Sequence, residues 1–357
     1  RRSAFSSDAQ RTLLFLALAA GALVLYRRRT LPAWGAGLAV VAIVAVDLWG
    51  VDARYMNEDR YSSEETEQAI PTYQFDQFIK KKQQEAGGLG RFRVLSLAEG
   101  DPTSTARPSY HYESIGGYHG AKLRRYQDYL DHILRVNASD GPNENALDLM
   151  NTRYLVARQQ LPGTEVAHRS RQSGVRVLEN PDAVPRGFLV GETEVMEGAE
   201  ETWAQLRDSS FDPRQTAVLP EPLEAPVTPI DSSSTAEVNL DRYAPEEMRW
   251  TVQTDAPRLF VASEVYYPAG WNAYLDGEQV PIHRVDYLLR GVHVPEGEHT
   301  LVMRFEPTAD RYGTWIATAS TVLVYGGILT YAGIRGRRRW LGAKDEEADD
   351  EKADDDA

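Results

Sequence analysis

The stretch SIGGYHGAKLRRYQDY at 114–129 combines glycines and basic side chains in a spacing that could bind an anion. Its three glycines permit a tight loop, and a helix beginning near Lys122 would point its positive N-terminal end at that loop. Backbone N–H groups, the helix dipole and cationic side chains can together hold a phosphate group. The candidate side chains for this chemistry are Lys122, Arg124 and Arg125.

The same stretch also fits a structural role. The segment 122–134 predicts a helix with one apolar stripe, and the glycines would then shape a loop that docks this helix. The stripe consists of Leu123, Tyr126, Leu130 and Ile133. Arg124 or Arg125 would pair with Asp128 or Asp131 on the helix surface. The stretch is neither a P-loop nor a G-x-G-x-x-G motif, so both interpretations stand.

Aromatic side chains near 266–287 form a second candidate site, because sugar rings stack on the faces of tryptophan and tyrosine. The aromatic candidates are Tyr266, Tyr267, Trp271, Tyr274 and Tyr287, with Asp286 and Arg290 as hydrogen-bonding partners. In a second interpretation, Trp271 and one tyrosine fill a small core. In a third, this aromatic edge meets the membrane surface near Tyr312 and Trp315.

Several chemistries are excluded or lack a signature. The chain has no cysteine, which removes disulfides, thiolate nucleophiles and thiolate metal ligands. The three histidines around the motif have no H-x-x-x-H or H-E-x-x-H spacing, so we expect no metal site. No G-x-S-x-G, Walker or paired-carboxylate signature is present, and the catalytic residues stay unknown. The net charge of -14 argues against a nucleic-acid partner.

Two folded regions are expected to position these side chains. Residues 51–220 predict a mixed α/β domain, and 221–232 is a proline-rich linker. The helices of the α/β domain are predicted at 72–84 and 199–208. Its strands are predicted at 91–97, 152–159, 175–179, 187–196 and 216–220. Residues 233–311 predict a β-sandwich of short aromatic and β-branched strands. In that region Asp276-Gly277 favours a two-residue hairpin turn, with Trp271, Ala273 and Leu275 on one strand face.

Apolar segments frame both regions. The spans are predicted at about 12–26 and 31–50, forming a transmembrane hairpin within 1–50, and at 312–334. Arginines follow the first and third spans, and the positive-inside rule makes their side cytoplasmic. The large region 51–311 is then extracytoplasmic, and 335–357 is a basic, then acidic, disordered cytoplasmic tail. We therefore expect a multi-pass protein of the cell membrane with a membrane-anchored α+β fold.

Three segments carry a resemblance to a known family: VDLWGVDARYMN at 46–57, the motif at 114–129, and residues 266–307. They resemble the YfhO-like bacterial multipass membrane proteins, which are grouped with the GT-C glycosyltransferases. The resemblance covers only the C-terminal part of the family's length. By position in the family motif, it adds His119 to Lys122, Arg124 and Arg125 as contacts to an anionic carrier or acceptor.

The resemblance implies transfer of a sugar from a polyprenyl-phosphate carrier to an extracytoplasmic glycopolymer, with the lipid-linked sugar as donor and no cofactor in this chain. The family's catalytic carboxylate is expected in an early loop of the N-terminal membrane bundle, so the chain would be the C-terminal part that positions acceptor or carrier. The alternative is a noncatalytic membrane-anchored module that binds surface polysaccharide or a partner protein.

Overall fold

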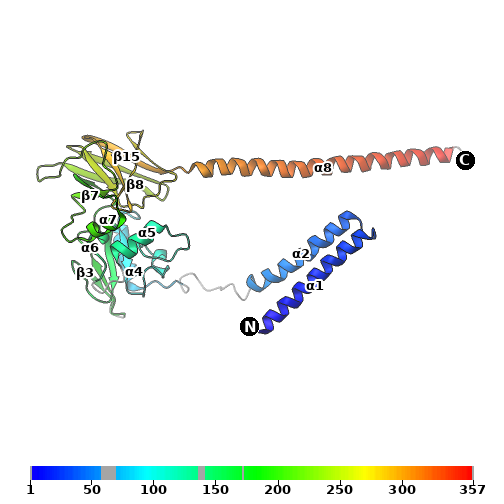
Figure 1. Ribbon diagram of the computed structural model, residues 1–357, viewed down its shortest axis with the longest axis horizontal. Coiled ribbons are helices and arrows are strands. Elements are labelled where there is room, and N and C mark those ends of the chain that lie inside the picture. Colours follow the sequence, from blue (N-terminus) through cyan, green and yellow to red (C-terminus); the bar gives the residue numbers. More distant parts are fainter. Residues whose placement is uncertain (1, 58–69, 136–140, 171–172, 356–357) are drawn as a thin grey trace. The chain divides into compact units, whose positions relative to one another are not determined.

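The computed structural model describes residues 2–57, 70–135, 141–170 and 173–355, with 2–9, 311 and 338–355 described by their backbone alone. The chain divides into two compact units, Arg1–Pro71 and Thr72–Ala357. It is a mixed α+β protein with two apolar helices near its N-terminus (Figure 1). Three segments of helix are long and apolar enough to cross a membrane: Gln10–Arg27, Ala33–Tyr55 and Thr308–Arg337.

The first unit contains the helical hairpin of α1 (Arg2–Arg27) and α2 (Ala33–Tyr55). Between the helices, Arg29 adopts a left-handed backbone with φ of 57°, and Pro32 occupies the N-cap position of α2. Arg11 on α1 pairs with the carboxylate of Asp47 on α2 at 2.8 Å and also donates to its backbone carbonyl. Because an isolated charge inside an apolar span is costly, this pair gives Asp47 a structural role.

The C-terminal helix α8 (Thr308–Asp355) contains the third apolar segment and continues beyond it. It extends through 335–355, which the sequence analysis predicted as disordered. After Gly342 the segment contains neither glycine nor proline, and its alanines, glutamates and lysines are good helix formers. The high charge of this segment therefore does not interrupt the helical backbone.

Within the second unit, one sheet follows the order β1-β2-β4-β3 and has α4 (Gln74–Glu85) associated with it. The helix predicted at 72–84 is confirmed, and its Phe75 and Ile79 pack into a core with Phe92 and Val94. The edge strand β3 was not predicted from the sequence, and it is only partly buried. The strands are β1 (Arg93–Ser96), β2 (Thr152–Ala157), β3 (Glu165–Arg169) and β4 (Arg176–Glu179).

The predicted α-helix at 122–134 is wrong in its second half. An α-helical segment, α5 (Arg124–Asp128), passes into a π-helical segment at Tyr129–Leu134. The N–H of Arg135 accordingly donates to the carbonyl of Leu130, five residues back, at 3.0 Å. This wider turn buries Tyr129 and Leu134 together with two of the predicted stripe residues, Leu130 and Ile133. The neighbouring helices are α6 (Glu144–Leu149) and α7 (Ala199–Arg207), of which α7 was predicted.

Two further sheets pack face to face, with the orders β12-β11-β15-β9-β8 and β13-β14-β10-β5. Trp250, Phe260 and Leu301 are fully buried in the core that both sheets supply. The first sheet comprises β8 (Ala236–Ala244), β9 (Glu247–Thr254), β11 (Trp271–Leu275), β12 (Glu278–Val280) and β15 (Gly297–Phe305). The second comprises β5 (Gly187–Val190), β10 (Arg258–Ala262), β13 (His283–Val285) and β14 (Leu289–Val294).

The β11–β12 hairpin has the predicted turn, and the side chains of β11 lie on the predicted faces of the strand. Asp276 and Gly277 both have positive φ, 52° and 91°, and Leu275 pairs with Glu278 across them. Ala273 is fully buried, with Trp271 and Leu275 packed against the same core. The pleat of the strand therefore places its side chains as the alternation predicted.

The sheet β13-β14-β10-β5 is buried on both faces. Leu189 and Phe260 face the core shared with β9 and β15, whereas Phe188 and Leu259 lie in a second core with the helical segments. Its strand β5 precedes the proline-rich segment 221–232, yet it pairs with β10, which follows that segment. The two regions expected from the sequence thus share one sheet.

The strand predicted at 187–196 is divided at Gly191 into β5 and β6 (Glu192–Val195), and β6 pairs in parallel with β7 (Thr216–Leu219). The backbone of the linker lies so close to Gly191 that only glycine fits at this position, where the chain passes from one sheet to the next. A Cβ atom there would lie 2.3 Å from the carbonyl oxygen of Thr228 and 2.7 Å from the N atom of Ile230. Neither backbone atom can move without displacing the linker.

We expect Gly191→Ala to lower the free energy of unfolding by about 1–3 kcal/mol, the usual cost of overpacking. The matched control is Gly120→Ala, since a Cβ at Gly120 has nothing within 4 Å and its φ is not positive. Denaturation of the full chain in detergent measures both variants. Equal stabilities would show that the linker is not packed against Gly191.

Candidate functional site

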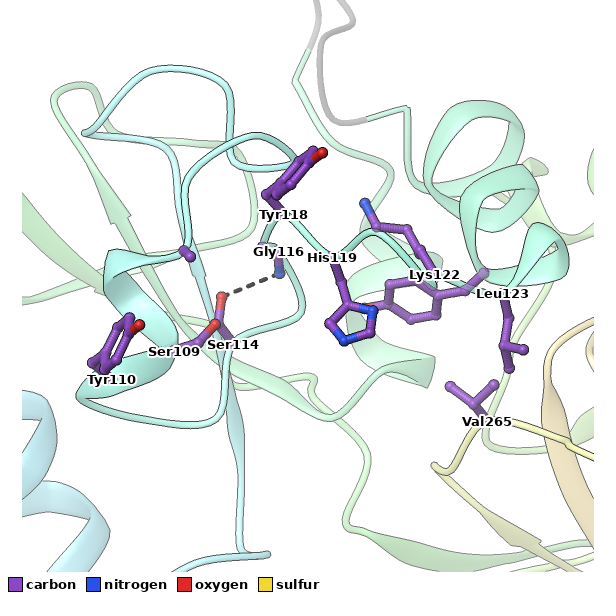
Figure 2. A pocket seen from close by; sticks show the side chains of 12 residues that line it. Ser109, Tyr110, Ser114, Gly116, Tyr118, His119, Lys122, Leu123 and Val265 are labelled. Carbon is purple, nitrogen blue, oxygen red and sulfur yellow. Dashed lines mark hydrogen bonds between the residues drawn. The ribbon is translucent and has the colours of Figure 1, made fainter. Parts of the chain in front are cut away.

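The motif at 114–129 lies along a cavity of about 550 Å³, here called the motif cavity (Figure 2). Its walls come from four segments: a 3₁₀ turn at Arg107–Tyr110, the glycine loop, the start of α5, and the segment after β10, which contributes Val265. Figure 2 shows Tyr110 and Ser109 on one side, and Leu123 and Val265 on the other. The lining residues are Ala106, Ser109, Tyr110, Ser114, Gly116, Gly117, Tyr118, His119, Lys122, Leu123, Tyr126 and Val265.

Two of the motif's three glycines are required by the loop. A Cβ at Gly116 would lie 2.4 Å from the carbonyl oxygen of Pro102, and Gly117 has a φ of 121°. The N–H of Gly117 donates to the same carbonyl at 2.7 Å, and that of Gly116 donates to the Ser114 hydroxyl. Gly120 has open space around it, so the loop does not need a glycine there.

An ion cluster holds the 3₁₀ turn on the other side of the cavity. Arg107 binds the fully buried Asp76 through two hydrogen bonds, at 2.7 and 3.1 Å, and also pairs with Glu99. Asp76 in turn accepts the backbone N–H of Tyr73 and caps α4. The wall that carries Tyr110 is therefore tied to a helix start rather than to a free loop.

The four predicted carrier or acceptor contacts are divided among different surroundings. His119 and Lys122 line the motif cavity, where His119 Nδ1 accepts the N–H of Ala121. Lys122 has no ion pair among the residues that the structure describes. Arg124 is 89% exposed and pairs with Asp128 at 2.8 Å, as the structural interpretation expected.

Arg125 faces a second cavity, of about 320 Å³, with its guanidinium 5.8 Å from the centroid of the Tyr266 ring. We call this the basic cavity. Its lining consists of Arg125, Leu219, Pro220, Glu221, Tyr266, Pro268, Ile282, His283 and Arg284.

Three of the predicted aromatic side chains come together in a third cavity, of about 170 Å³, here called the aromatic cavity. Tyr266, Tyr267 and Trp271 line it beside Arg290, whose guanidinium lies 3.8 Å from the Trp271 ring centroid. Trp271 also packs against the sandwich core, as the core interpretation predicted, and its role as a sugar contact stays a prediction. Tyr266 belongs to the basic cavity as well, and the two cavities are contiguous there.

The remaining candidates of this set do not join the aromatic cavity. Tyr274 lies on the opposite face of β11 and donates its hydroxyl to Glu306 at 2.7 Å. Tyr287 donates to Asp128 and packs edge-on against Trp203. Asp286 is fully buried, so its predicted role as a sugar contact is wrong.

Sequence reasoning missed the residues Arg284 and His283 of the basic cavity, and Tyr110 and Tyr118 of the motif cavity. Tyr110 and Tyr118 are 67% and 70% exposed. Their positions on either side of the glycine pair were a usable signal in the sequence. The sequence gave no signal for Arg284, because its position opposite Arg290 depends on how β13 and β14 pair.

Among the described residues, no group of three or more His, Asp or Glu side chains could hold a metal ion. His111 is buried 4.0 Å from Asp76, and His132 stacks on Trp203 with 4.0 Å between ring centroids. The histidines around the motif are therefore in separate environments.

Comparisons with family models, with curated proteins and with solved structures gave no match. The case for a function therefore rests on the cavities and on the sequence resemblance.

Asp286 makes the stability of this region dependent on pH. Burial raises the pKa of its carboxyl from 3.8 to about 7, against the hydrogen bond from the N–H of Val218. Between those two pH values the folded protein keeps a proton that the unfolded chain has released. The free energy of unfolding therefore falls as the pH rises from about 4 to about 7.

We expect Asp286→Asn to flatten this decline, because the amide does not titrate. Thermal unfolding of the full chain between pH 5 and pH 8 measures it. Asp231→Asn is the control: Ser233 lowers the pKa of Asp231, so its effect on stability lies below that pH range. An unchanged slope in Asp286→Asn would assign the pH dependence to another group.

Proposed function

We propose that this chain is the C-terminal part of an integral membrane GT-C-like glycosyltransferase. In this proposal the enzyme passes a sugar from a polyprenyl-phosphate carrier to an extracytoplasmic glycopolymer. The folded region of residues 72–307 holds the carrier or the acceptor during transfer. The sequence resemblance supports this assignment, and the three membrane-length helical segments are compatible with it.

One observation carries the proposal: the motif and the aromatic segment, far apart in sequence, both line the basic cavity. Arg125 of the motif lies against the ring of Tyr266 there, and Val265, the residue before Tyr266, lines the motif cavity with Tyr126. Cationic and aromatic side chains thus lie where a sugar with an anionic group could meet both.

The motif cavity has the chemistry that a lipid phosphate requires. Leu123, Tyr126 and Val265 supply apolar walls, and Lys122 supplies a cation free of ion pairs within the described part of the chain. An amphiphile with an apolar chain and one anionic group fits such a lining. We assign no catalytic role to these side chains, which would bind and orient the carrier.

The aromatic cavity favours a second candidate function, a noncatalytic membrane-anchored module that binds surface polysaccharide. Tyr267 and Trp271 lie together there, and aromatic rings can bind a sugar without taking part in chemistry. This candidate shares the binding surface but requires no lipid-linked donor. Binding of the carrier therefore separates the two candidates.

In membranes that contain the full chain, we expect Lys122→Ala to weaken binding of decaprenyl phosphate about tenfold. A hydrogen bond to a charged group contributes about 1.5–3 kcal/mol. The control is Lys81→Ala, which removes an exposed lysine from α4, outside the cavity. Binding is measured by displacement of a fluorescent lipid phosphate. Equal affinities of the two variants, or equal binding of decaprenol, would refute the carrier role.

The proposal also requires the folded region to be extracytoplasmic and the arginines after the first and third spans to be cytoplasmic. The chain has no cysteine, so single cysteines report the side of the membrane directly. In intact cells, Ser233→Cys should react with an impermeant thiol reagent and Ala343→Cys should not. The reverse labelling pattern would invert the topology and place the cavities in the cytoplasm.

A further inference from the structure

Three arginines lie in or beside the basic cavity: Arg125 and Arg284 line it, and Arg290 lines the adjoining aromatic cavity. Arg284 on β13 lies directly opposite Arg290 on β14, which places both side chains on the same face of the sheet. Arg125 lines the same cavity as Arg284. Like charges directly opposite each other destabilise a strand pair, so this arrangement favours an anionic ligand.

The nearby carboxylates offset this charge only in part: Glu221 raises the pKa of Arg284 and Glu264 raises that of Arg290, but burial outweighs both. Glu264 pairs with Arg93 at 3.1 Å and with Arg186 at 2.7 Å. Glu221 lines the basic cavity but is exposed to solvent. Across the ranges that the structure describes, neither Arg125 nor Arg284 has an ion pair.

The electrostatics agree with this geometry. Burial lowers the pKa of Arg284, and the positive charge of Arg125 lowers it further. Burial also lowers the pKa of Arg290 to about 10. Its Nη1 atom is buried without a hydrogen-bond partner in the described part of the chain. A bound anion would favour the charged form of all three guanidinium groups.

The aromatic cavity continues directly from the basic cavity. The two share Tyr266, Pro268 and Ile282, and Tyr267 and Trp271 lie beyond them. A ligand that occupied both would place an anionic group against the arginines and a ring against the aromatic side chains. Inorganic phosphate alone could occupy only the first part.

We propose that the basic and aromatic cavities form one site for an anionic sugar, with its phosphate or carboxylate between Arg125 and Arg284 and its ring beside Tyr267 and Trp271. The proposal extends the proposed function by naming the class of sugar. A lipid-linked donor and an acidic acceptor glycan both supply such a group.

The test measures binding of soluble probes to the full chain by isothermal titration calorimetry. We expect glucose 1-phosphate or glucuronic acid to bind at least tenfold more tightly than glucose and than inorganic phosphate. Arg284→Gln and Arg125→Gln should each weaken that binding at least tenfold. Tyr267→Ala should weaken it severalfold without changing the weak binding of inorganic phosphate.

Arg124→Gln is the matched control, because Arg124 is next to Arg125 but lies outside both cavities and should change affinity less than twofold. Arg284→Gln removes one of two opposed like charges, so we expect its folding to be retained. If the Arg284→Gln variant unfolds, the affinities of Arg125→Gln and Tyr267→Ala test the proposal. The proposal is overturned if no probe binds, if glucose binds as well as the anionic sugars, or if the Arg125 and Arg124 variants behave alike.

Competition distinguishes the two sources of the sugar. Displacement of decaprenyl phosphate by glucose 1-phosphate would show that the lipid phosphate also reaches Arg125 and Arg284, which supports the donor, and simultaneous binding would support the acceptor. Binding of the soluble anionic sugars themselves is measured without lipid, so it is tested separately from the carrier role of Lys122. A chain that binds decaprenyl phosphate but no anionic sugar would retain the proposed function and lose this inference.

Discussion

The buried guanidinium of Arg186, just before β5, ties together two segments that are far apart in the sequence, one at Glu113 and one at Glu264. It pairs with Glu113 at 2.6 Å and with Glu264 at 2.7 Å, and its side chain is 2% exposed. Burial lowers the pKa of Arg186, but the two carboxylates outweigh that effect and the net shift is upward. Removing one member of such a buried set typically costs about 3–5 kcal/mol, because it leaves a charge unpaired.

This network also fixes where the candidate site can form. Glu113 immediately precedes the motif, and its carboxylate accepts the N–H of Gly90 and the hydroxyl of Tyr243. Its backbone carbonyl accepts the N–H of Val94 on β1. Glu264 is next to Val265, which lines the motif cavity. The ion network therefore ends at both segments that meet around the cavities, and it limits how far they can move apart.

The sequence predicted the elements whose signal is local. Asp276-Gly277 identified its turn because both positions need positive φ, and the alternation in β11 gave the correct facing. The hairpin of β13 and β14 was missed because its left-handed positions are occupied by Asp286 and Tyr287 rather than glycine. The π-helical turn and the opposed arginines depend on tertiary packing and cross-strand register, which no local pattern records. The membrane sidedness and the chemistry of sugar transfer remain predictions.

The sharing of one sheet across the proline-rich segment has a kinetic consequence. β5 is complete at Val190, but its partner strand begins only at Arg258, and all four residues of β5 are buried in the native fold. During synthesis, β5 therefore stays unpaired until the strand that covers it has been made. Such long-range pairing slows folding and leaves an apolar strand edge exposed to aggregation in the meantime. The folding nucleus of this region is expected to form late, when the chain beyond the linker has emerged.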